Sequence, residues 1–491
     1  MTDVLLTHSY FLRFDPKEFR AMMPYPPLGT MIAANHLRGL GYSVALFDSM
    51  LARTEQEIIP LIEKHRPSVV VIYDDDFNYL TKMCLSRMRE AAFVMSRLAK
   101  ERGCTVVVHG SDPADHAAEY LDHGADAVIV GEGEITLGEY IEHVLRHRGS
   151  GAAINGLVTT TNGTLTRTPP RKVLHDLDTL PFAAWDLIDV DAYRSAWRDR
   201  HGYFSVNMVT TRGCPFHCNW CAKPLYGQVY NSRSPENVVD EMLLLRKTVR
   251  PDHLWFCDDI FGLKPGWVAA FSDEVRRRDA VIPFKCLSRV DLLLNDTTIA
   301  DLHRAGCTTV WVGAESGSQK ILDAMEKGTT VAQIREATRR MHAEGIRVGF
   351  FLQYGYPGET RSDIELTLGM VRECRPDEIG ISVSYPLPGT KFHSMVREQL
   401  GAKHNWTDSE DLDMMFAGTY STEFYRALHT VTHKKFRLWQ AAEILRTTMR
   451  HPTSIRAGSL RRLGAAAYHF VTLPRYQRAM EACAATPRLP V

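Results

Sequence analysis

The chain has 491 residues, of which 45% are hydrophobic and 24% charged, and its 58 basic residues are balanced by 58 acidic ones. This composition is typical of a folded enzyme, and the zero net charge argues against a protein that holds nucleic acid through a basic surface. The sequence has no apolar run long enough to span a membrane and no basic flank before its first apolar stretch. We therefore expect no transmembrane segment and no signal peptide, and a cytoplasmic chain whose ten cysteines are reduced.

Strand and helix patterns alternate through residues 1–150. Each short apolar run is followed by a longer stretch of helical periodicity, which predicts an α/β domain with a doubly wound, Rossmann-like parallel sheet. Ligands of such sheets bind outside the carboxyl ends of the strands. The expected strands are 4–10, 42–47, 68–73, 105–109 and 127–130, and the expected helices between them include 28–40, 56–64, 83–101 and 114–122.

Residues 151–200 are expected to form a wrapping linker with a small hairpin around Asn162-Gly163. From 201 to 395 the alternation resumes, with six expected strands. Because a closed barrel needs eight strands, six predict an open, partial (β/α)6 TIM barrel. The strands are expected at 205–211, 253–257, 282–286, 308–313, 347–352 and 379–384.

Residues 396–491 are expected to be helical. From Lys434 onward they contain eleven Lys or Arg and two Glu, mixed with aromatic and aliphatic residues. We favour a helical cap over the substrate, with a solvated basic face, as the interpretation of this region. Peripheral contact with a membrane surface is the alternative.

The sharpest chemical signal is the run 211–221, Thr-Arg-Gly-Cys-Pro-Phe-His-Cys-Asn-Trp-Cys, which follows an expected strand. Cys214, Cys218 and Cys221 can serve one soft metal centre. A zinc site with His217 as fourth ligand is one interpretation, although this spacing is unusual for zinc. A 4Fe–4S cluster held by three cysteines is another, and it leaves one iron without a protein ligand.

This Cys-x3-Cys-x2-Cys motif resembles the signature of the radical S-adenosylmethionine (SAM) superfamily. The resemblance continues in motifs that follow the later barrel strands, at 255–261, 288–291, 313–318, 353–360 and 385–390. It implies that the open iron binds SAM and that one electron cleaves SAM to a 5′-deoxyadenosyl radical. The candidate SAM-binding residues are Trp220, Asp258, Asp259, Arg289, Gly313 and Glu315.

The first domain resembles the cobalamin-binding domain of one radical SAM subfamily. The matching segments are 26–29, 107–113, 130–134 and the connector 177–186. Candidate cobalamin-binding residues are Gly110, Ser111, Gly131 and Gly133. The Asp-x-His-x-x-Gly motif of many cobalamin domains is missing after the first strand, so we expect cobalamin without a histidine lower ligand.

The resemblance implies hydrogen abstraction from an unactivated carbon of a small-molecule substrate, followed by methyl transfer from methylcobalamin in a biosynthetic pathway. A flavodoxin- or ferredoxin-like donor would reduce the cluster. Oxidative cyclisation or ring rearrangement, as in the anaerobic magnesium-protoporphyrin ester cyclase, is the first alternative. A corrinoid- or cluster-binding scaffold without catalysis is the second. The motifs identify neither the substrate nor a catalytic residue.

Overall fold

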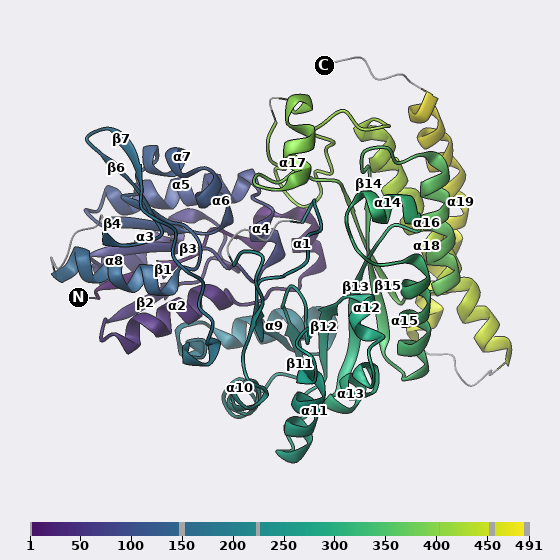
Figure 1. Ribbon diagram of the computed structural model, residues 1–491, viewed down its shortest axis with the longest axis horizontal. Coiled ribbons are helices and arrows are strands. Elements are labelled where there is room, and N and C mark those ends of the chain that lie inside the picture. The colour runs from purple at the N-terminus through teal and green to yellow at the C-terminus, as the bar shows by residue number, and fades with distance from the viewer. Residues whose placement is uncertain (1, 147–152, 222–225, 402, 451–456, 486–491) are drawn as a thin grey trace.

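The computed structural model describes residues 2–146, 153–221, 226–401, 403–450 and 457–485. Two sheets lie side by side, each covered by helices, and a helical hairpin lies on the outer side of the second sheet (Figure 1). The domain boundary expected at residue 150 falls outside the described residues.

The N-terminal sheet has the strand order β2-β1-β3-β4-β5-β6-β7, and its first five strands in the chain are parallel. The middle strand of these five, β3, is an unbroken Val-Val-Val-Ile-Tyr run that is buried throughout, as a strand covered on both faces must be. Separate apolar cores lie on the two faces, under α2 and α8 and under α3 and α5. The expected Rossmann-like sheet is confirmed. Its elements are β1 (Val4–Thr7), β2 (Val44–Phe47), β3 (Val69–Tyr73), β4 (Thr105–His109), β5 (Ala127–Ile129), α2 (Leu28–Gly39), α3 (Ile58–His65), α5 (Ser86–Lys100) and α8 (Glu134–Arg146).

Two local expectations for this half of the chain differ from the structure. The hairpin placed in the linker, β6 (Leu157–Thr161) and β7 (Thr164–Arg167), instead extends the sheet by antiparallel pairing with β5. Asn162 and Gly163 both have positive φ, as a two-residue hairpin turn requires. The helix expected over 83–101 is α5, which begins three residues later than expected because Cys84 takes the left-handed conformation, and a short helix that was not expected, α4 (Tyr79–Lys82), precedes it.

The second sheet is parallel and open, with the order β15-β14-β13-β12-β11-β8. This is the expected partial barrel of six strands. Helices return the chain between successive strands on the outside of the curved sheet (Figure 1). The strands are β8 (Ser205–Met208), β11 (His253–Phe256), β12 (Phe284–Ser288), β13 (Cys307–Glu315), β14 (Arg347–Tyr354) and β15 (Glu378–Val383), and the helices include α10 (Pro235–Thr248), α11 (Trp267–Arg277), α13 (Thr298–Ala305), α15 (Val331–Ala343) and α16 (Arg361–Cys374).

The two longest helices, α18 (Thr422–Arg450) and α19 (Ala457–Ala485), lie on the outside of the barrel. The side chain of Gln440 on α18 donates to the carbonyl of Asp377, directly before β15, at 2.9 Å. On its other side, Lys434 donates to Thr472 of α19 at 2.8 Å. These helices therefore cover the β15 edge and α16, and α18 also reaches the carboxyl end of β14, where the hydroxyls of Tyr354 and Thr432 lie 3.3 Å apart. The substrate cap expected over residues 396–491 stays a prediction.

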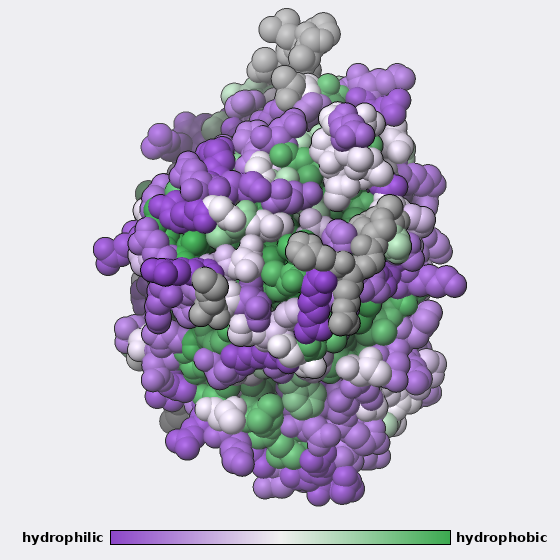
Figure 2. All heavy atoms as spheres, turned by 90° about the vertical axis from the view of Figure 1, so that its left-hand side faces the viewer, coloured by the Kyte–Doolittle hydropathy of each residue, from purple (hydrophilic) through white to green (hydrophobic). Residues whose placement is uncertain are grey.

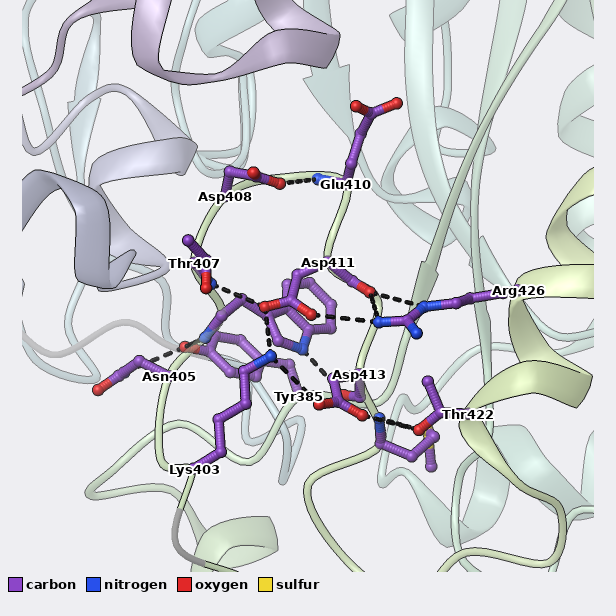
Figure 3. A network of polar contacts seen from close by, with 12 residues as sticks. Tyr385, Lys403, Asn405, Thr407, Asp408, Glu410, Asp411, Asp413, Thr422 and Arg426 are labelled. Carbon is purple, nitrogen blue, oxygen red and sulfur yellow. Dashed lines mark hydrogen bonds and ion pairs between the residues drawn. The ribbon is translucent and has the colours of Figure 1, made fainter.

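An irregular segment, 400–421, connects the barrel to the N-terminal domain instead. Trp406 stacks on Tyr385, just after β15, with ring centroids 4.4 Å apart. Ser409 donates to Asp15, and Arg89 of α5 donates to Asn405 at 2.8 Å. Ion pairs of Asp411 with Lys403 and Arg426 hold the segment in shape (Figure 3). The two halves of the molecule are thus tied together by this segment.

Candidate active site

The cysteine loop begins directly after a short antiparallel pair, β9 (Thr211–Arg212) with β10 (Asn231–Ser232), past the end of β8. Gly213 has φ 81°, and a Cβ there would lie 2.2 Å from the carbonyl oxygen of Val229. Only glycine fits this close approach. Cys214 and Cys218 are buried and Cys221 is partly buried. The fold therefore presents the thiols at the carboxyl end of the first barrel strand.

The surroundings of Cys221 show that the loop gathers its thiols. Burial raises the pKa of Cys221 to about 12, and the negative charges of Asp259, Cys218 and Cys214 act in the same direction. Three thiolates from one loop are the donor set of a 4Fe–4S cube, which binds each thiolate at a different iron and leaves the fourth iron open.

Arg289, directly after β12, points at the cysteine loop. Its guanidinium lies 3.6 Å from the centre of the Phe216 ring, and its Nη1 lies 3.9 Å from the sulfur of Cys218. Asp291 and the carbonyl of Lys327 accept hydrogen bonds from its other nitrogens at 3.0–3.1 Å. The side chain is only 6% exposed. This places a fixed positive charge beside the thiols.

Glu315 ends β13 with φ 53°, at a point where the register to β14 shifts. Its carboxylate accepts from Lys327 at 2.8 Å, and both side chains are buried. A Cβ on Gly313 would lie 2.4 Å from the carboxylate and 2.5 Å from the ammonium, so glycine makes room for this pair. Lys327 also lies 5.7 Å from the centre of the Trp220 ring, whose Nε1 is buried without a partner.

The two aspartates after β11 have different surroundings. Asp258 is buried. Its carboxylate accepts hydrogen bonds from the backbone amides of Thr210 and Thr211 and from the hydroxyl of Thr210, at 2.7–2.8 Å. Burial raises its pKa to about 6. Asp259 is partly exposed and pairs with Lys82 of the N-terminal domain at 2.6 Å. Asp258 thus holds the chain that leads to the cysteine loop, while Asp259 faces the gap between the domains near Cys221.

The expected cobalamin residues lie at the carboxyl edge of the N-terminal sheet. Gly110 has φ 144° and packs on Asp74, Gly131 has φ 83°, and a Cβ on Gly133 would clash with Tyr73. Backbone conformation or packing therefore already requires glycine at each of these three positions, independently of any ligand. Ser111 begins α6 (Ser111–Asp115), and its hydroxyl is buried without a partner.

Further unpaired polar atoms lie at the same edge. The hydroxyl of Ser9, after β1, and one carboxylate oxygen of Asp76, after β3, are buried without a hydrogen-bond partner. Unsatisfied buried polar groups are costly, so they mark places where a ligand or water is expected. The edge therefore fits a large ligand with many polar groups, such as a corrinoid with its nucleotide tail.

One buried cluster, which no motif predicts, joins this edge to the cysteine loop. Arg212, two residues before Cys214, donates to Glu134 at 2.6 Å and to Glu132 at 3.2 Å. All three side chains are buried. Glu132 and Glu134 flank Gly133, so the loop expected to bind cobalamin also anchors the cysteine loop. Lys327 and Lys82, the partners of Glu315 and Asp259, were missed likewise, because neither lysine lies in a strand-end motif.

Comparison with known proteins agrees with this geometry. Residues 208–371 match the family model of the radical SAM superfamily. An uncharacterized methyltransferase of Pyrococcus horikoshii is 28% identical over 79% of this chain and 82% of its own. The anaerobic magnesium-protoporphyrin IX monomethyl ester cyclase of Rubrivivax gelatinosus is 27% identical over 79% of this chain and 68% of its own.

Two solved structures share the fold. The radical SAM methyltransferase TsrM of Kitasatospora setae, solved with cobalamin and a 4Fe–4S cluster, superposes with a TM-score of 0.65 at 20% identity, over 81% of this chain and 75% of its own. The cobalamin-dependent SAM radical enzyme OxsB superposes with a TM-score of 0.68 at 16% identity, over 98% of this chain and 72% of its own.

The cysteine loop and the barrel around it thus form a radical SAM domain over residues 208–371. The arrangement of an N-terminal Rossmann-like domain before this barrel is the fold that the chain shares with the two cobalamin-dependent enzymes.

Proposed function

We propose that this enzyme transfers a methyl group to an unactivated carbon of a small molecule, with a 4Fe–4S cluster, SAM and cobalamin as cofactors. The observation that carries the proposal is the loop of three thiols at the end of β8, enclosed by Arg289 and the Glu315–Lys327 pair and facing the carboxyl edge of the Rossmann-like sheet. The methyltransferase from Pyrococcus horikoshii, similar along 82% of its length, supports the choice of methyl transfer.

When bound, the cluster supplies the electron that cleaves SAM, and cobalamin supplies a transferable methyl group. Cys214, Cys218 and Cys221 would hold three irons of the cluster. Arg289 and Lys327 place positive charge beside the thiolates, and charge of this sign stabilises an anionic cluster and a carboxylate.

Of the two aspartates, we assign SAM binding to Asp259, since the carboxylate of Asp258 is already occupied by Thr210 and Thr211. Glu315 and Trp220 would line the same site, with Gly313 giving Glu315 its room. Lys82, paired with Asp259, would help to exclude water between the two cofactors.

On the N-terminal domain, Ser111, Gly110, Gly131 and Gly133 remain the proposed cobalamin contacts, with Ser9 added for its unpaired hydroxyl. The domain limits proposed above stay 1–150, 151–200, 201–395 and 396–491, except that the hairpin 157–167 joins the first sheet. We further propose a flavodoxin- or ferredoxin-like electron donor and a cytoplasmic location, where reduced thiols persist.

The test uses anaerobically purified, cluster-reconstituted protein, loaded with hydroxocobalamin and desalted. We expect about four irons and one corrinoid per chain, and formation of both 5′-deoxyadenosine and S-adenosylhomocysteine after addition of dithionite and SAM. Cys218→Ala should lose the cluster, whereas the matched control Cys374→Ala, on the outer helix α16, should keep it. Four irons without retained corrinoid would contradict the cobalamin assignment.

Oxidative cyclisation is the second candidate, because the Rubrivivax gelatinosus cyclase is 27% identical over 79% of this chain. The same assay separates the two. A cyclase would form 5′-deoxyadenosine without S-adenosylhomocysteine, and a scaffold without catalysis would form neither product.

A further inference from the structure

The end of α18 and the outer face of α19 expose large apolar side chains. Six of them are between 51% and 77% exposed, and we call this set the tail patch: Leu445, Met449, Leu460, Tyr468, Phe470 and Val471. The tail patch belongs to α18 and α19, the two helices on the right-hand side of Figure 1.

The inner side of α19 is already occupied by the protein itself. Thr472 accepts from Lys434 and Met480 is 2% exposed. At about 100° per residue, Leu460, Val471 and Pro474 lie on the side of α19 opposite Met480. Arg478 and Glu481 fall on the same side, so the outer side of α19 carries exposed apolar residues together with charged ones.

The charge around the tail patch is mainly positive. Residues 444–485 contain seven arginines (446, 450, 456, 461, 462, 475 and 478) and one acidic residue, Glu481, so their net charge is 7 − 1 = +6. Arg461, Arg462, Arg475 and Arg478 are exposed on α19 beside the apolar residues. Basic residues that border exposed aromatic and aliphatic side chains are the pattern of a helix lying on an anionic bilayer.

A second copy of the chain is the less suitable occupant, because symmetrical packing of two tail patches would bring the same arginines together. The opposite side of the molecule, over the N-terminal domain, is largely hydrophilic, with apolar side chains interspersed (Figure 2). Attraction to lipid is thus expected on the tail side. No helix in the described part of the chain has the length and apolar character needed to cross a membrane.

We propose that the tail patch docks this enzyme on the surface of an anionic lipid bilayer, with Phe470 and Val471 entering the interface and the flanking arginines contacting lipid phosphates. The contact is peripheral and reversible. This membrane contact goes beyond the proposed chemistry. It can be measured without turnover, so its test is independent of the assignment of methyl transfer. It also reverses our sequence-based preference for a purely solvated basic face.

The experiment is cosedimentation of the full-length protein with vesicles of phosphatidylcholine alone and of phosphatidylcholine with 30% phosphatidylglycerol. We expect binding to the anionic vesicles only, and release at high salt. Phe470→Ser with Val471→Ser should weaken binding about tenfold or more. Arg461→Gln with Arg475→Gln should weaken it about 25-fold, at about fivefold per arginine.

Matched controls lie elsewhere on the surface. Leu366→Ser, on exposed α16, and Arg339→Gln, on exposed α15, should leave vesicle binding unchanged. All variants should keep the thermal stability of the parent protein. Failure to bind anionic vesicles would overturn the proposal, as would equal losses in the controls. A concentration-dependent dimer that the Phe470 and Val471 substitutions abolish would also overturn it, in favour of a second copy.

Discussion

Among single residues of the site, Glu315 and Lys327 form a buried ion pair whose disruption we expect to lower stability. Removing one partner of a buried pair leaves an uncompensated charge, which costs about 3–5 kcal/mol. We therefore expect Lys327→Met to lower the free energy of unfolding of the cofactor-free protein by about that amount, as measured by urea denaturation. Lys327→Met combined with Glu315→Gln should recover most of the loss. A change below about 1 kcal/mol in the single variant would contradict the coupling.

Glu359 should make stability depend on pH. It is fully buried after β14, where it accepts from the amide of Gly355 at 2.7 Å, and burial raises its pKa to about 8. Between about pH 4.5 and 8, the unfolded chain releases a proton that the folded chain keeps. The contribution of this group to the free energy of unfolding should therefore fall by about 1.4 kcal/mol for each pH unit as the pH rises through this range.

Denaturation between pH 5 and 8 tests this, because Glu359→Gln removes the titrating carboxyl. The advantage of Glu359→Gln over the parent should widen as the pH rises. The exposed Glu344→Gln should show no such widening, and a pH-independent difference for Glu359→Gln would refute the assignment.

Sequence motifs predict some residues of the site and miss others for a physical reason. Cys214, Cys218 and Cys221 are local in sequence, so their spacing alone predicts a cluster loop. Arg289 and Glu315 follow strands, and strand ends meet at one edge of a barrel. Lys327 follows a short helix, and only the packing around Gly313 brings it to Glu315. No pattern in the sequence predicts the contact between Lys327 and Glu315.

At the level of elements, the β9 strand depends on the N-terminal domain through Arg212. We expect Arg212→Met to leave Glu132 and Glu134 buried without a counter-charge, and so to cost about 3–5 kcal/mol and to reduce the iron retained per chain. Addition of Glu132→Gln and Glu134→Gln should restore stability. The control Arg335→Met breaks a pair with Glu373 in which both side chains are at least half exposed, and should cost less than about 1 kcal/mol.

Element types are predicted well from the sequence where strands are buried on both faces, as in β3. They are predicted poorly where a single residue breaks a pattern. The apolar periodicity of 83–101 continues through Cys84, and nothing in it shows the positive φ that delays the start of α5 to Ser86. The β6–β7 hairpin was recognised from its turn, but its partner strand β5 could not be, because pairing between distant strands leaves no local signal.

The whole molecule should unfold as one unit. Its largest apolar core contains Tyr10, Met31 and Phe77 from the N-terminal domain together with Phe256 and Tyr425 from the barrel side. A shared core couples the two halves, although multidomain chains often unfold in steps. We expect calorimetry and tryptophan fluorescence to give coincident thermal transitions for the cofactor-free protein. Two separated transitions would contradict this.

The contacts of Arg212 and Asp259 with the N-terminal domain also bear on domain exchange. Here the segment that leads into the cysteine loop is held by Glu132 and Glu134, and Asp259, after β11, is paired with Lys82. A chimera that joins this barrel to a foreign cobalamin domain would lose those supports unless the same three side chains were transplanted with it. A functional exchange between related enzymes should therefore transfer the N-terminal domain together with its contact residues on the barrel, Arg212 and Asp259.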